Sequence, residues 1–258
     1  MQAALQPGYF LRAAQLIENA LATDSGRVLI GTGFPVDNTF ETDGPLGAIA
    51  LYQTLEKLGG NPVLVCGAPL ADCLAKDFTT YKIAVADNAN REQEARQALD
   101  HWQPDLVISI ERPGLNAEGK YCNMRGEDIS ANCASFDYFL NLAHCPTIGI
   151  GDGGNEIGMG NVVGTLARLD IKPSITCCDE LLVADVSNWA AHGLIALLSS
   201  IRNTDMLAGW DNIAVLRHLS AHGSVDGVSR KNTLTEDGLE SAVSEQLINE
   251  LRKIGGFC

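Results

Sequence analysis

Short apolar runs alternate with segments of helical spacing along this chain, and this alternation limits the fold more than any other feature. Strands are expected at 27–31, 62–67, 81–86, 106–110, 147–150 and 181–186, with a further apolar run at 175–178. Helices are expected at 7–22, 45–58, 70–76, 91–102, 129–143, beyond Glu156, and at 187–198, 210–219 and 239–254. Strands that are apolar on nearly every residue are typical of a parallel sheet covered on both faces. The pattern predicts an α/β fold with a doubly wound, mostly parallel sheet and helices on both faces, in three layers.

The composition is that of one ordinary globular domain. The 258 residues are 46% hydrophobic and 19% charged, with no internal repeat or low-complexity linker, so we expect a single domain over 1–258. The formal net charge is -14, which disfavours binding to nucleic acid or to an anionic membrane surface and attracts cations. An apolar stretch long enough to span a bilayer is lacking. The sequence leaves the oligomeric state open, a homo-oligomer included.

The cysteines indicate a reducing compartment. Eight are present, without a CxxC pair or zinc-finger spacing, and several lie within apolar runs. Reduced and mostly buried thiols in a cytoplasmic protein are therefore expected. The amino terminus also lacks the features of a secretion signal.

A glycine-rich turn follows the strand at 147–150. The sequence runs through Gly151-Asp152-Gly153-Gly154-Asn155-Glu156 into a segment compatible with a helix. Glycines let the backbone approach a ligand, and a helix start aims unpaired N–H groups into the turn. Two acids and an amide among three glycines exceed what a helix cap needs, so the turn predicts a metal or polar-ligand site. The alternative is a glycine turn with a good N-cap.

Two other strands end in a similar way. The first is followed by Gly33 and then by Glu41-Thr42-Asp43-Gly44 at a helix start, and the strand at 106–110 is followed by Glu111 and Arg112. The glycines at 31 and 33 lack the third glycine of a dinucleotide fingerprint, which argues against a nicotinamide cofactor. Ordinary capping at Asp43 and a surface ion pair between Glu111 and Arg112 are the alternatives. Because ligands bind at the carboxyl ends of parallel strands, we expect these groups to converge.

The remaining candidates are scattered. Ser187 and Asn188 begin a strongly apolar helix, where each suits either an N-cap or a ligand contact, and Asp226 lies in a turn at 223–228. The polar segment 115–127 is either a flap over the site or a mobile loop. The histidines at 144, 192, 218 and 222 show no metal-binding spacing, so capping or surface roles are expected for them.

These motifs together resemble the D-glutamate cyclase family, in its carboxyl-terminal domain. The resemblance rests on GTGFP, ETDGP, ERPG, GDGGNE, VSNW and VDGV, which begin at residues 31, 41, 111, 151, 186 and 225, and it extends from about Leu29 to Gly227. It implies an α/β domain with a metal-supported site, and the conversion of D-glutamate to 5-oxo-D-proline with loss of water.

A mechanism for that reaction assigns a role to each candidate. A divalent ion (Mg, Mn or Ca), bound by Glu111, Asp152 and Glu156, would polarise the γ-carboxylate of a small acidic metabolite. Asp43 or Asp226 would carry the ammonium proton, which requires a raised pKa. Arg112, or the N–H groups of Gly153 and Gly154, would hold the α-carboxylate. The other expected substrate contacts are Gly33, Thr42, Asn155, Ser187 and Asn188.

Two other functions fit the same residues. Carboxylates at the ends of parallel strands with a divalent cation also serve phosphoryl hydrolysis or transfer. A non-catalytic binder of an acidic metabolite is the third hypothesis.

Overall fold

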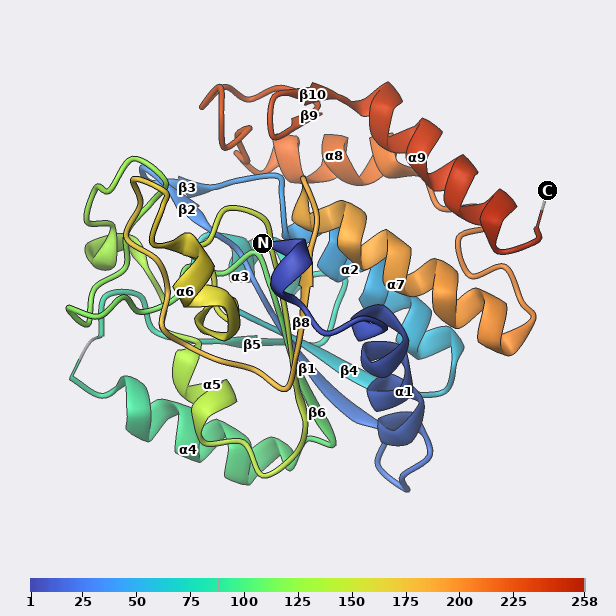
Figure 1. Ribbon diagram of the computed structural model, residues 1–258, viewed down its shortest axis with the longest axis horizontal. Coiled ribbons are helices and arrows are strands. Elements are labelled where there is room, and N and C mark those ends of the chain that lie inside the picture. Colours follow the sequence, from blue (N-terminus) through green and yellow to red (C-terminus); the bar gives the residue numbers. More distant parts are fainter. Residues whose placement is uncertain (88, 258) are drawn as a thin grey trace.

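A six-stranded sheet forms the centre of the protein. The computed structural model describes residues 1–87 and 89–257 and is shown in Figure 1. In spatial order the strands are β5 (Thr80–Lys82), β4 (Asn61–Cys66), β1 (Arg27–Thr32), β6 (Leu106–Ile110), β7 (Thr147–Gly151) and β8 (Glu180–Val183). All neighbouring pairs are parallel. The prediction of a doubly wound parallel sheet is confirmed.

The strand order creates a natural ligand site. The chain winds outward from β1 through β4 to β5, and then returns to the other side of β1 to form β6, β7 and β8. In doubly wound sheets, a crevice opens outside the carboxyl ends of the two strands where the winding reverses. Here those strands are β1 and β6, which pair from Val28↔Leu106 to Thr32↔Ile110.

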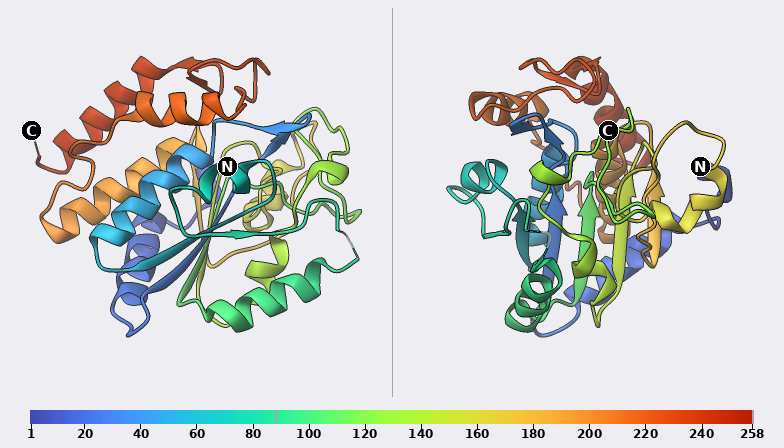
Figure 2. Two further views of the ribbon diagram at one scale, coloured as in Figure 1. Left: turned by 180° about the vertical axis from the view of Figure 1, so that it is seen from behind. Right: turned by 90° about the vertical axis from the view of Figure 1, so that its left-hand side faces the viewer.

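Helices cover both faces of the sheet, as expected. Alternate residues of β1 face opposite layers, because Val28 and Ile30 belong to one core cluster and Leu29 to another. The first cluster is covered by α1 (Tyr9–Leu21), α2 (Pro45–Lys57), α3 (Leu70–Leu74) and α7 (Ser187–Arg202), and the second by α4 (Arg91–Trp102) and α5 (Asp137–Asn141). Figure 2 shows the layers from two further directions. The three-layer arrangement is confirmed.

Additional elements gather beyond the strand ends. The carboxyl-terminal part contributes α8 (Asn212–Ala221), α9 (Ser241–Ile254) and a hairpin of β9 (Thr235–Glu236) with β10 (Leu239–Glu240), seen in orange and red in Figure 1. A second hairpin joins β2 (Pro35–Val36) to β3 (Thr39–Phe40), and short helical turns are η1 (Gln2–Ala4), η2 (Ser130–Asn132), η3 (Met159–Val162) and α6 (Val163–Leu166). The described residues form no helix long and apolar enough to cross a membrane.

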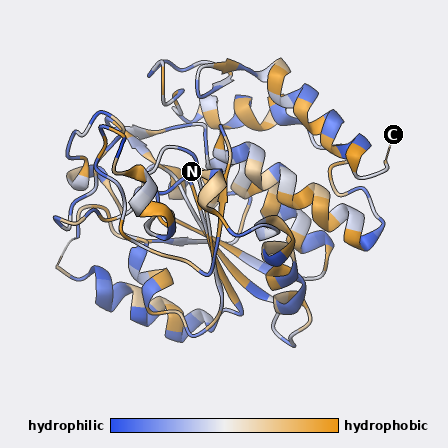
Figure 3. Cartoon of the chain, viewed as in Figure 1, coloured by the Kyte–Doolittle hydropathy of each residue, from blue (hydrophilic) through white to orange (hydrophobic). Residues whose placement is uncertain are grey.

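Hydropathy explains which helices are buried. In Figure 3, hydrophobic residues concentrate along the central strands, while α4 and α9 carry many hydrophilic residues. Helix α2 is the contrasting case, because ten of its thirteen residues are buried. It packs against both α7 and the sheet, which leaves it little exposed surface.

The helix predicted at 129–143 is wrong over most of its length. Only η2 and the five residues of α5 are helical. Between them the chain is extended, because Ala134 bridges to Val85 and the carbonyl of Cys133 accepts from the N–H of Ala86. The buried carboxylate of Asp137 then accepts hydrogen bonds from the Leu115 N–H and the Tyr121 hydroxyl. These long-range contacts outweigh local helical spacing.

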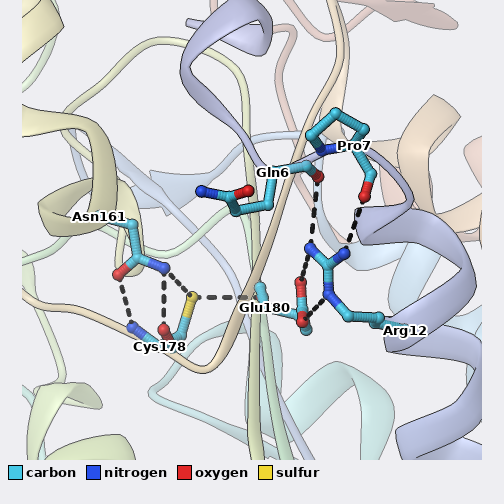
Figure 4. A network of polar contacts seen from close by, with 6 residues as sticks. All are labelled: Gln6, Pro7, Arg12, Asn161, Cys178 and Glu180. Atoms are coloured by element: carbon cyan, nitrogen blue, oxygen red, sulfur yellow. Dashed lines mark hydrogen bonds and ion pairs between the residues drawn. The ribbon is translucent and has the colours of Figure 1, made fainter.

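The apolar run at 175–178 is also no strand. The carbonyl of Thr176 accepts from the N–H groups of Gly158 and Gly160, and Asn161 exchanges hydrogen bonds with the backbone of Cys178, as Figure 4 shows. The segment therefore docks on the turn before η3. In the same figure, Arg12 pairs with Glu180 and joins α1 to β8.

Candidate functional site

A cavity of about 1130 Å³ opens at the predicted edge of the sheet. Its wall includes residues that follow β1, β6, β7 and β8, together with part of the 115–127 segment and the β9–β10 turn. The segment 115–127 therefore forms part of the wall of a ligand-sized cavity. This is the position expected for a flap over the site. Five acidic residues in the wall are largely withdrawn from solvent: Glu41, Glu111, Asp152, Glu156 and Asp237.

Glu111 is held in a strained backbone conformation. Its φ is 45°, in the left-handed region that non-glycine residues rarely occupy. Gly44 makes room for it, because a Cβ at Gly44 would lie 2.6 Å from the Glu111 Cβ. The Ser187 hydroxyl donates to the Glu111 carboxylate at 2.6 Å. Ser187 thus orients Glu111, and it contributes to the site through that residue.

Asp43 and Asn188 cap each other's helices. The Asp43 carboxylate accepts from the N–H groups of Ser187 and Asn188 at 2.8 Å each, at the start of α7. In return, the side-chain oxygen of Asn188 accepts from the N–H groups of Gly44 and Gly47, at the start of α2. Neither helix has a cap from its own N-cap residue, so the exchange satisfies donors that would otherwise be buried without partners.

The glycine turn is occupied by its own carboxylate. Glu156 accepts from the N–H of Gly153 at 3.0 Å and from the N–H of Gly154 at 2.7 Å. The donors that were expected to hold a substrate carboxylate are therefore already engaged. Asn155 is a residue of the cavity wall and donates to the carbonyl of Cys122, while its side-chain oxygen is buried without a hydrogen-bond partner among the described residues.

Burial and mutual repulsion raise the pKa values of the five acidic residues that are largely withdrawn from solvent. Burial raises the pKa of Glu41 and of Glu111 well above the usual range, and neighbouring carboxylates add to the effect. Burial, Glu156 and Asp43 raise the pKa of Asp152 to about 12, with a further contribution from a hydrogen bond to Asp237. A group of carboxyls that cannot all ionise in isolation can ionise around a cation.

Three carboxylates are placed to share such a cation. One oxygen from each of Asp43, Glu111 and Asp152 lies within 4.8 Å of the other two. The set overlaps the predicted ligands Glu111 and Asp152, with Asp43 in the place expected for Glu156. Burial raises the pKa of Asp43, against the opposing effect of its bonds to α7. The residues fit a hard cation, because every donor in the set is an oxygen.

Other predicted site residues lie behind the cavity wall. The Arg112 guanidinium is buried and donates to the backbone carbonyls of Thr32, Gly33 and Ala134, which ties β6 to β1. The ion pair with Glu111 that was the alternative is not among those that the described residues form. Thr42 donates to the carbonyl of Thr235. Gly33 has a φ of 101° and packs against Leu70.

Asp226 does not meet the requirement set for a proton carrier. It accepts from the N–H groups of Val228, Ser229 and Gly238, and it organises the loop that leads to the β9–β10 turn. Although burial opposes ionisation, these hydrogen bonds outweigh it and lower the pKa of Asp226. An ionised carboxylate with three donors is a structural anchor.

Asp237 was missed by the sequence analysis, although a signal for it exists. Asp237 and Gly238 form the two-residue turn between β9 and β10, with φ values of 49° and 77°. An Asp-Gly pair is a strong hairpin signal. The strands on either side have only two residues each, so the alternation that usually accompanies the signal is absent. Glu41 was noted as part of the Glu41–Gly44 motif but was given no role.

The fold and the cavity define a class: a doubly wound α/β protein with an acidic, cation-suited site at the switch point of its sheet. Comparison with known sequences makes this specific. The family model described as D-glutamate cyclase-like, C-terminal, matches residues 1–252, so the chain belongs to that family.

One curated relative and one solved structure illustrate the relationship. Human mitochondrial D-glutamate cyclase is 31% identical over 219 residues, which cover 74% of this chain and 36% of the human protein. The chain thus spans about a third of that relative's length. An exopolyphosphatase-related protein from Bacteroides fragilis superposes with a TM-score of 0.47 at 11% identity, over 97% of this chain and 58% of that one. A likeness at that level supports no argument about function.

Proposed function

We propose that this chain converts D-glutamate to 5-oxo-D-proline with loss of water, with the support of a divalent cation. The observation that carries the proposal is the convergence of Asp43, Glu111 and Asp152 oxygens within 4.8 Å at the wall of a substrate-sized cavity. Membership of the D-glutamate cyclase-like family supports a cyclase-type reaction. Because the chain matches only part of the human relative, the substrate itself belongs to the proposal.

The cation would be held by Asp43, Glu111 and Asp152. Magnesium, manganese and calcium suit a set of carboxylate oxygens. Asn155 lines the same cavity, and its buried side-chain oxygen has no hydrogen-bond partner among the described residues, so a small rotation of the amide would let this oxygen contact the cation or the substrate. When bound, the cation supplies Lewis-acid polarisation of the γ-carboxylate. It also offsets the negative charge that would otherwise repel an acidic metabolite.

Ring closure moves two protons from nitrogen to oxygen. The α-amine attacks the γ-carboxyl carbon, the C–N bond forms, and one carboxyl oxygen leaves as water after taking both protons. Glu41 lines the cavity and has a raised pKa, so it suits the transfer of these protons. Asp237 offers a second carboxyl in the same wall, close enough to Glu41 to contribute to its raised pKa. In this scheme Asp43 is a cation ligand, whereas the sequence predicted that it carries a proton.

The α-carboxylate needs a positive partner in the wall. Arg230 lines the cavity and pairs with Glu127 at 3.2 Å. We place the substrate's α-carboxylate against Arg230, since the Arg112 guanidinium is engaged with backbone carbonyls. Holding one end of glutamate while the other is polarised brings the amine to the γ-carbon.

The direct test is turnover by the purified chain. We expect 5-oxoproline to form from D-glutamate in the presence of manganese, magnesium or calcium, and the product to be absent with Asp152→Asn. Asp185→Asn, an exposed acid in the wall of the same cavity, is the matched control and should retain activity. If D-glutamate is left unchanged with all three cations, the proposed activity is refuted for this chain.

The same assay separates the competing functions. Hydrolysis of phosphate esters without 5-oxoproline formation would favour the metal-dependent phosphoryl hydrolase. A thermal shift with D-glutamate but no product would indicate a binding protein. The seven described cysteines, which are free thiols, support our proposal that the protein works in a reducing compartment such as the cytoplasm.

A further inference from the structure

A second group of metal-ligating side chains lies away from the acidic cavity. Cys73 belongs to α3, while His218 lies in the last turn of α8 and His222 follows it at the end of that helix, four residues further along the chain. Their ligand atoms all lie within 4.8 Å of one another. Asp77, just beyond α3, has a carboxylate oxygen 3.9 Å from Nε2 of His218. These four residues are outside the described lining of the acidic cavity.

The distances match those around a tetrahedral zinc ion. Zn–S and Zn–N bonds of the usual lengths, at a tetrahedral angle, put sulfur and nitrogen roughly 3.6 Å apart. The Cys73 Sγ and the His218 Nε2 are 3.5 Å apart. The side chains therefore already stand close to the separation that coordination requires.

One histidine is also held in the orientation that a metal ligand needs. The Nδ1 of His222 lies 2.8 Å from the carbonyl oxygen of His218, so this nitrogen donates and the Nε2 keeps its lone pair. A hydrogen bond from the second ring nitrogen to a carbonyl is typical of metal-bound histidine. The Nε2 faces the Lys76 ammonium at 3.1 Å, and Lys76 is an exposed side chain that can move into solvent.

We propose that Cys73, His218 and His222 bind a borderline divalent ion such as zinc, with Asp77 or a water as the fourth ligand. Binding forms a metal–sulfur bond and releases the thiol proton to solvent. Mixed sulfur and nitrogen donors favour zinc over the hard cations suited to the acidic cavity. The ion would clip α3, at the edge of the sheet, to α8, which precedes the loop that carries Asp226 and Asp237.

The sequence alone could not show this site. The two histidines have the spacing of one helical turn, but the cysteine lies 145 residues from His218. Histidines with this spacing and without a nearby third ligand fit capping or surface roles equally well. Only the packing of α3 near α8 supplies the sulfur.

Cobalt(II) substitution tests the proposal on the full chain. Cobalt bound to a thiolate gives an intense charge-transfer band, which cobalt bound only to carboxylates does not. We expect this band in the wild type, its loss in Cys73→Ala, and its retention in Cys145→Ala, which removes a cysteine that packs against the second core cluster. Zinc should displace cobalt and abolish the band. About one zinc should remain per chain after gel filtration, as a closed site holds it.

Two further variants keep the test decisive if Cys73→Ala fails to fold. His222→Gln retains the thiol and should weaken zinc binding by more than about tenfold, the order of loss caused even by outer partners of a metal site. Lys76→Met removes the competing ammonium and should tighten it. A wild type without the charge-transfer band, or a band unchanged by Cys73→Ala and His222→Gln, overturns the proposal whatever the outcome of the D-glutamate assay.

Discussion

Replacing Asp152 with asparagine should stabilise the metal-free protein. With a pKa of about 12 in the folded chain and an ordinary value of 3.8, Asp152 must take up a proton when the chain folds at pH 7. The difference between pH 7 and 3.8 corresponds to roughly 4 kcal/mol of lost stability. Because Asp152 is partly open to the cavity and shares its proton with Asp237, we expect a gain of about 2 to 4 kcal/mol.

The sign of the pH dependence follows from the same proton. Above pH 3.8 the unfolded chain releases it while the folded chain keeps it, so wild-type stability falls as pH rises toward 12. From pH 6 to pH 8, this group alone should remove up to about 3 kcal/mol. The side-chain amide introduced by Asp152→Asn would still donate a hydrogen bond to Asp237, so this variant should show a flatter profile.

Urea unfolding at pH 6 and pH 8 with a chelator measures both effects. The expected gain corresponds to a melting temperature higher by about 5 to 12 °C for a chain of this size. Asp185→Asn removes the same charge from an exposed position in the cavity wall and should change neither the stability nor its slope appreciably. Manganese should stabilise the wild type and Asp185→Asn but not Asp152→Asn. A metal-free Asp152→Asn that is no more stable than the wild type at pH 8 would refute the reasoning.

Three other perturbations have defined outcomes. Asn188→Ala leaves the Gly44 and Gly47 N–H groups without their acceptor and should cost about 2 to 4 kcal/mol in urea unfolding, whereas Asn141→Ala, at an exposed helical position, should cost much less. Burial without a hydrogen-bond partner lowers the pKa of His192 to about 4, so the unfolded chain alone gains a proton below pH 6.5. The wild type should therefore lose roughly 3 kcal/mol of stability through this group between pH 6.5 and pH 4, and His192→Phe should not show this loss. If the stability of the two proteins fell equally with pH, the lowered pKa of His192 would be contradicted. Gly31→Ala would place a Cβ 2.3 Å from the ring of Phe136 and should cost about 1 to 3 kcal/mol by thermal unfolding; an unaffected melting temperature would disprove the close contact.

The strands were predictable because a strand that is buried on both faces is apolar at nearly every residue, and the sequence shows this directly. Each of the four central strands is a run of apolar residues long enough to be recognised without its neighbours. The segment 129–143 has comparable apolar spacing but a different outcome, since its conformation depends on Val85, Leu115 and Tyr121. Local spacing cannot report contacts of that kind.

The convergence of acidic residues at one edge of the sheet was predictable, but the contacts of each candidate residue were predictable only in part. The rule that ligands bind at strand carboxyl ends brought Glu111 and Asp152 together correctly in space. The orientation of each carboxylate depends on the hydrogen-bond donors behind it. These donors come from distant parts of the chain, so the sequence does not reveal them. The reciprocal capping that turns Asp43 toward Glu111 joins residues 144 and 145 positions apart.

The donors behind the acids explain how so many carboxyl groups can be brought together in the metal-free protein. Asp43 is held by the start of α7, Glu156 by the glycine turn, and Glu111 by the Ser187 hydroxyl. Each contact satisfies part of a carboxylate and fixes its direction, so the cation-binding geometry exists without reorganisation. The remaining repulsion and desolvation stay as a cost to folding, visible in the raised pKa of Asp152 and of Glu41. Because these carboxyls hold protons in the metal-free protein, a cation would have to displace them, so its binding should release protons and strengthen as pH rises. Such binding would couple the stability of the fold to occupancy of the site.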